Sequence, residues 1–169
     1  WVMSLWRVTA LAVTIAPPLL SALAPAMLAA SAPLLVGAAW AWRAAEKKGE
    51  SESLKLSDPV ELSLMLRFAL LLAGIMVLAK LLSGGENELF ALAGISGLLD
   101  VDPITLSMAR ESNEGLSQFL AVSTILIASA SNALAKSVLA VIFGGWRLGL
   151  WLSGLAVAGA AAGALVFFT

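Results

Sequence analysis

Long apolar stretches separated by short polar ones dominate this chain. Residues 8–42 contain no charged side chain, and Pro17 interrupts this run because proline lacks an N–H donor and clashes with the preceding helical turn. The pattern predicts one helix over residues 1–15, missing its beginning, and a longer one over residues 18–46. Apolar runs of this length are typical of helices that cross a membrane.

The polar segment 44–57 mixes Lys, Glu, Ser and Gly, and it holds the densest positive charge in the chain. Positive charge between membrane helices favours the cytoplasmic side, so we expect a cytoplasmic loop here. Asp58 and Pro59 form a typical helix start immediately after it. Further helices are predicted over residues 58–82, 86–99, 103–110, 115–143 and 146–168.

The helices over 86–99 and 103–110 are each too short to cross a bilayer alone. They flank the segment Asp100-Val101-Asp102-Pro103, which forms either a break within one spanning element or the turn of a re-entrant pair. We therefore predict an all-α integral membrane protein with about five transmembrane helices plus this broken or re-entrant pair. Residues 1–169 are expected to form a single polytopic membrane domain.

Composition supports this class and excludes several others. Hydrophobic residues make up 60% of the chain, charged residues make up 12%, and the mean hydropathy is +0.96. The absence of Cys and His removes thiolate and imidazole metal sites and histidine-based catalysis. A net charge of −1 gives no reason to expect nucleic acid as a partner. No serine lies in a nucleophile elbow, and we do not expect an enzyme.

The helix break holds the first candidate site. Asp100 and Asp102 are two positions apart and would face the same cavity if the break is extended. Carboxylates beside free helix carbonyls suit a cation such as Mg²⁺, Na⁺ or H⁺, with Thr105 and Ser107 adding hydroxyl oxygens. Asp102 precedes Pro103 and has an alternative role as the N-cap of the second short helix. No capping role is evident for Asp100.

A second polar group lies on the helix 115–143. Ser129, Asn132 and Lys136 share one face, and Ser131 lies beside them. A buried ammonium needs a partner, so Lys136 is predicted either to pair with the two aspartates or to extend toward the membrane surface. The candidate ion- or substrate-binding residues are Asp100, Asp102, Thr105, Ser107, Ser131, Asn132 and Lys136, with Asp100 and Asp102 as metal ligands.

Three segments together resemble a known family. Residues 58–62 are similar to Asn-Pro-Phe-Glu-Leu, residues 94–107 to Gly-Leu-x-Asp-Val-Asp-Ala-Ile-Thr-x-Ser, and residues 131–136 to Ser-Asn-Thr-Leu-x-Lys. This combination resembles the uncharacterised C-terminal membrane domain of MgtC/SapB-family proteins, also called domain of unknown function 4010. The resemblance is good over residues 58–168 and loose before them. It departs at Pro103, where the family commonly has Ala.

The resemblance implies a transporter of the bacterial or archaeal inner membrane, with a loose association with magnesium. It also implies an N-terminal MgtC-like membrane region as a partner domain. From the residues we predict a cation transporter or channel in which Lys136 is the internal counter-charge, with no cofactor beyond a bound cation. The glycines of the last helix, Gly154, Gly159 and Gly163, predict close packing and a homodimer. The alternative is a non-transporting module that binds or regulates a partner, with the Asp–Lys cluster as a structural ion pair.

Overall fold

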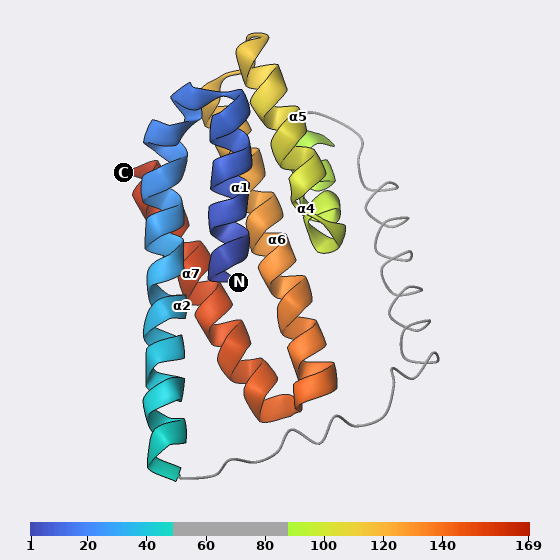
Figure 1. Cartoon of the computed structure of the whole chain (residues 1–169). Coiled ribbons are helices and arrows are strands. Elements are labelled where there is room, and N and C mark those ends of the chain that lie inside the picture. Colours follow the sequence, from blue (N-terminus) through green and yellow to red (C-terminus); the bar gives the residue numbers. More distant parts are fainter. Residues whose placement is uncertain (49–87) are drawn as a thin grey trace.

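The computed structural model describes residues 1–48 and 88–169, and within these ranges every regular element is a helix (Figure 1). Three of these helices are long and apolar enough to cross a membrane, over Pro17–Arg43, Gln118–Ile142 and Trp146–Phe168. Large apolar side chains such as Leu35, Leu134 and Val157 are exposed on them, as is usual for surfaces that face lipid. The predicted helix 58–82 and most of the polar loop 44–57 lie outside the described residues.

The predicted helix boundaries agree closely with the structure. Helix α1 covers Val2–Ile15, and a short 3₁₀ turn at Pro17–Leu19 leads into α2, Leu20–Lys48. After the undescribed segment come the two short helices α4, Glu88–Leu99, and α5, Asp102–Asn113. The last two helices are α6, Gln118–Gly144, and α7, Trp146–Phe168. Helices α6 and α7 meet at Gly145, whose φ of 82° favours glycine.

Helices α2 and α7 pack against each other along their length and run antiparallel (Figure 1). A Cβ added at Gly159 would lie 2.7 Å from the carbonyl oxygen of Ala30, and one at Gly163 would lie 3.0 Å from that of Ala26. Gly154, by contrast, has nothing within 4 Å of its Cβ position. The predicted close packing is therefore confirmed for Gly159 and Gly163, and both pack against α2 of the same chain.

The same pairing places basic and aromatic residues together at one end of the bundle. The rings of Trp40 and Trp151 lie 5.8 Å apart, and each Trp is about one helical turn from an arginine of its own helix, Arg43 on α2 and Arg147 at the start of α7. At the opposite end, Phe119 of α6 stacks on Phe167 of α7 with 5.3 Å between ring centroids. The turn between α6 and α7 therefore lies on the same side as the end of α2, and α6 begins on the other side.

Helix α5 lies alongside α1 and runs in the same direction. Arg7 of α1 contacts Asp102 at the start of α5, and the side chain of Asn113 at its end donates a hydrogen bond to the carbonyl oxygen of Ile15, at 2.8 Å. Apolar side chains from α1, α2, α5 and α6 form much of the buried core. The core includes Val8, Leu23, Met27, Met108 and Ile125.

Candidate functional site

The two short helices meet at Asp100 and Val101, and the meeting point faces the middle of α6. Asn132 donates a hydrogen bond from Nδ2 to the carbonyl oxygen of Gly97 at 3.0 Å, and Ser131 donates one to that of Gly94 at 2.6 Å. These carbonyls lie near the C-terminal end of α4, and Gly97 has no side chain to separate the helices. A Cβ there would lie 2.2 Å from the carbonyl oxygen of Ala128. Ser131 and Asn132 therefore fix the end of α4 against α6.

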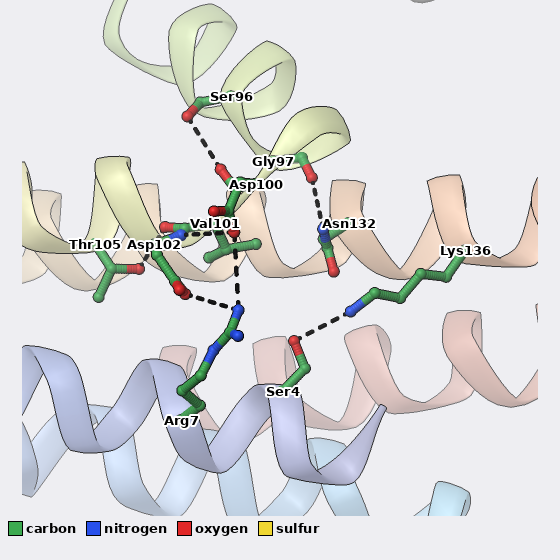
Figure 2. A network of polar contacts seen from close by, with 10 residues as sticks. All are labelled: Ser4, Arg7, Ser96, Gly97, Asp100, Val101, Asp102, Thr105, Asn132 and Lys136. Atoms are coloured by element: carbon green, nitrogen blue, oxygen red, sulfur yellow. Dashed lines mark hydrogen bonds and ion pairs between the residues drawn. The ribbon is translucent and has the colours of Figure 1, made fainter. Parts of the chain in front are cut away.

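Arg7 is the cation that holds the two aspartates (Figure 2). One of its terminal nitrogens lies 3.0 Å from Oδ1 of Asp102 and 3.8 Å from Oδ1 of Asp100. The Asp102 oxygen is buried and, within the described part of the chain, no donor is aligned with it as a hydrogen bond. The contact with Arg7 is therefore an attraction between charges rather than a directed bond. We call Arg7, Asp100 and Asp102 the charge cluster.

The predicted roles of the two aspartates are reversed in part. The alternative role for Asp102, as the N-cap of α5, is wrong, because Val101 occupies the N-cap position and Asp102 is the first residue of the helix. Instead, Oδ1 of Asp100 accepts a hydrogen bond from the backbone N–H of Asp102 at 3.3 Å. Asp100 thus supports the first turn of α5, although no capping role was expected for it. The backbone between the two helices places the carboxylate of Asp100 within reach of the N–H group of Asp102.

The expected direct pairing of Lys136 with the aspartates does not occur in the described residues. The ammonium of Lys136 donates a hydrogen bond to the hydroxyl of Ser4 at 3.1 Å instead. Figure 2 shows Ser4 between the ammonium of Lys136 and Arg7 of the charge cluster. Arg7 is closer to the carboxylates because α5 lies along α1, an arrangement that the sequence pattern does not reveal.

The two hydroxyl groups predicted to complete a cation site point elsewhere. Thr105 is fully buried, and its hydroxyl donates a hydrogen bond to the carbonyl oxygen of Val101 at 2.8 Å. Ser107 donates one to Glu111 at 3.1 Å. Among the described residues, no group of three or more acidic, His or Cys side chains is arranged to hold a metal ion. The carboxylates of Asp100 and Asp102 both lie against Arg7.

Two contributors were missed by the sequence interpretation, Arg7 and Ser4, and Ser129 was placed in the second polar group but not among the candidate site residues. A signal for Arg7 was present, since an arginine within an apolar helix requires a partner of opposite charge. Ser129 is 8% exposed, and its hydroxyl has no hydrogen-bond partner in the described parts of the chain. The spacing of Ser129 from Asn132 and Lys136 placed it on their helix face, but it does not reveal that the hydroxyl lacks a partner.

Comparison with known proteins places the chain in a family but assigns no activity. An uncharacterised protein from Aquifex aeolicus (strain VF5) is 35% identical over 105 residues, which cover 60% of this chain and 46% of that protein. The matched part thus spans less than half the length of this relative. No solved structure matches the chain. The family model described as "Domain of unknown function (DUF4010)" matches residues 1–144, which include the first two helices, and the chain therefore belongs to that family.

Proposed function

We propose that this domain conducts a cation across the membrane through the charge cluster. The observation that carries the proposal is the exposure of charged side chains at mid-depth. The side chain of Arg7 is 57% exposed and that of Asp100 is 54% exposed. The break that holds Asp100 contacts α6 at Asn132, which is 14 residues from the start and 12 residues from the end of that helix. These intervals correspond to about 18 to 21 Å on either side.

Half-exposed charges at this depth are costly if hydrocarbon surrounds them. Their open side therefore requires either water or another polar surface. A water-filled path that reaches Asp100 and Arg7 from one side of the membrane meets this requirement, and it would bring ions to the carboxylates. Helix breaks at mid-depth are also the common position of ion sites in transporters.

In this mechanism, an arriving cation competes with Arg7 for Asp100 and Asp102. The two carboxylates would supply hard oxygen ligands, and the released guanidinium would turn toward water on the exposed side. With only two carboxylates, a divalent ion such as Mg²⁺ would retain several of its water molecules. Lys136 would act at a distance as a second positive charge that limits the residence of the ion.

The proposal includes a topology of five spans with a re-entrant pair. Helix α2 ends at the basic end of the bundle and α6 begins at the opposite end, so the chain between them crosses an odd number of times. If the predicted helix 58–82 supplies that crossing, α4 and α5 enter and leave on the same side. The spans would then be residues 1–15, 18–46, 58–82, 115–143 and 146–168.

The proposal also covers the location of the domain, its neighbouring domain and its assembly. The resemblance to MgtC/SapB-family proteins supports a position in the inner membrane after an N-terminal MgtC-like region. A homodimer would need a surface other than Gly159 and Gly163, because both contact α2. Gly94 and Gly154 have open space at their Cβ positions and would suit such a contact.

A second candidate function is a non-transporting module that binds or regulates a partner. Charge balance favours it, because Arg7 and Lys136 offset Asp100 and Asp102 without an added ion. In that case the open side of the charge cluster would be covered by the polar surface of the partner. The cluster would fix the register of α1, α5 and α6 and would carry no flux.

Cation flux into liposomes distinguishes the two functions. The protein is reconstituted and tested with Mg²⁺, Na⁺, K⁺ and H⁺, in parallel with Asp100→Asn and Asp102→Asn. Glu114→Gln serves as the matched control, since this exposed acid lies in the turn before α6, outside the charge cluster. Flux that both aspartate variants lose and the control retains supports transport. An absence of flux from wild-type protein of confirmed fold contradicts it.

A further inference from the structure

A cavity of about 300 Å³ lies between α1, α2, α6 and α7. Its walls are mostly apolar and include Val8, Met27, Leu126 and Phe167. Arg7, Asp100 and Asp102 are not among the residues that line it, although Val101, which lies between the two aspartates, is. Its volume is at the lower end of the range of small-molecule sites, about 300 to 1,000 Å³.

A few polar groups interrupt these apolar walls. Lys136 lines the cavity, and its ammonium contacts the hydroxyl of Ser4, with no ion pair to a carboxylate within the described ranges. Ser129 also lines the cavity, and its buried hydroxyl has no partner among the described residues. An ammonium beside an apolar chamber is typical of a site that accepts a ligand with one anionic group and an apolar remainder. The unsatisfied hydroxyl of Ser129 lies about two helical turns from Lys136 and offers a separate polar group in the same wall.

We propose that this cavity binds a small organic carboxylate with a short apolar tail. The carboxylate accepts hydrogen bonds from Nζ of Lys136 and the hydroxyl of Ser4, and the tail packs against Val8, Met27 and Leu126. Among the described residues, Lys136 is the one charged side chain that lines the cavity, which favours a singly charged carboxylate over a doubly charged phosphate. The proposed cation flux also uses Lys136, but only as a charge at a distance, whereas here its ammonium binds the ligand directly. A binding assay therefore tests this site whether or not the domain conducts a cation.

Equilibrium dialysis of the full chain in lipid nanodiscs tests the proposal with radiolabelled 4-methylpentanoate, and empty nanodiscs give the background. We expect saturable binding that unlabelled 4-methylpentanoate displaces. Two competitors of the same shape identify the group that is recognised: 4-methylpentanamide has no charge, and 4-methylpentylamine has the opposite charge. Neither is expected to displace the label at concentrations at which the carboxylate does so fully.

Variants locate the binding within the cavity. Lys136→Met keeps the apolar stem and removes the charge, and it should weaken binding about tenfold or more, as expected for a lost charged hydrogen bond. Lys136→Arg should retain most of the affinity. Ala133→Phe should block the cavity while leaving the ammonium in place. Arg110→Met removes an exposed cation on α5 that does not line the cavity, and it should bind normally.

Gel filtration and thermal unfolding establish that each variant is folded before it is compared. If Lys136→Met does not fold, Ala133→Phe and the two competitors still decide the question. The proposal is overturned if wild-type protein shows no saturable binding above empty nanodiscs. The proposal is also overturned if 4-methylpentylamine displaces the label as effectively as 4-methylpentanoate does. Unchanged affinity in folded Lys136→Met or Ala133→Phe overturns it as well.

Discussion

The guanidinium of Arg7 lies 3.0 Å from the carboxylate of Asp102, and this contact joins the middle of α1 to the first residue of α5. The Asp102 side chain is 26% exposed, whereas that of Asp100 is 54% exposed. The two aspartates therefore depend on Arg7 to different extents. The more buried carboxylate loses more if the cation is removed, because less water is available to replace it.

Replacement of Arg7 by Met should destabilise the protein by about 1 to 3 kcal/mol, between the values for exposed and buried ion pairs. The variant leaves two neighbouring carboxylates without their cation. Thermal unfolding in nanodiscs, followed by circular dichroism, measures the effect. Adding Asp102→Asn to the Arg7→Met variant should recover part of the lost stability. If Asp100→Asn recovers stability in the Arg7→Met variant and Asp102→Asn does not, Asp102 is not the main partner of Arg7.

Gly97→Ala should destabilise the contact between α4 and α6 by about 1 to 3 kcal/mol, as in overpacked cores. The added methyl group would lie 2.2 Å from a backbone oxygen, and a backbone cannot move aside as a side chain can. Gly94→Ala is the matched control on the same helix, because nothing lies within 4 Å of its Cβ position. The control should be neutral or more stable by up to about 1 kcal/mol, since alanine favours helices. Equal melting temperatures for the two variants would contradict this packing.

Gly159→Ala should separate α7 from α2, and Gly154→Ala should not. The first added methyl group would lie 2.7 Å from the carbonyl oxygen of Ala30, whereas the second would enter open space. Tilting of the helices would increase the distance between Trp40 and Trp151, whose rings now lie 5.8 Å apart. Disulfide formation between Cys residues placed at 40 and 151 measures this distance. We expect slower cross-linking with Gly159→Ala and an unchanged rate with Gly154→Ala.

Replacement of Asn132 by Ala should cost about 1 kcal/mol, because it leaves the carbonyl oxygen of Gly97 without its donor within the bundle. Ser131→Ala removes the corresponding bond to Gly94 and should have a similar effect. Hydrogen exchange of the α4 amides, measured by mass spectrometry, should increase in both variants. An increase in exchange that is confined to α6, with exchange in α4 unchanged, would show that these hydrogen bonds do not hold α4.

The two ends of the bundle can be assigned to the two sides of the membrane by single-cysteine labelling. The chain contains no Cys, so each introduced thiol is the sole target. Arg147→Cys should react with an impermeant maleimide from the cytoplasmic side, together with Arg43→Cys. Ser117→Cys, at the start of α6, should react from the opposite side. Labelling of positions 43 and 147 from different sides would contradict the arrangement of α2 and α7.

Much of the helical framework could be predicted because it depends on local features. Pro17 ends the first helix through its missing N–H, and Gly145 separates the last two through its positive φ. Ser117 caps α6 by accepting a hydrogen bond from the N–H of Leu120. Such signals involve neighbours in sequence, so the pattern of residues contains them.

The partners within the candidate site could not be predicted in the same way. Lys136 and Arg7 are both cations within apolar helices, and the sequence does not indicate which one α5 approaches. Gly154, Gly159 and Gly163 have similar surroundings in the sequence, yet two face α2 and one does not. These differences arise from helix rotation and from contacts between distant segments, and sequence spacing alone does not determine either.

Helix α5 is attached to α1 at both of its ends, through Asp102 to Arg7 and through Asn113 to Ile15. Two attachments about 16 Å apart along one helix prevent it from swinging independently of its neighbour. Because Ser131 and Asn132 also hold α4 against α6, the joint between the two short helices is restrained from both sides while all these contacts are made. An ion that separates Arg7 from Asp102 would release one of the two attachments and give α5 freedom to pivot about Asn113.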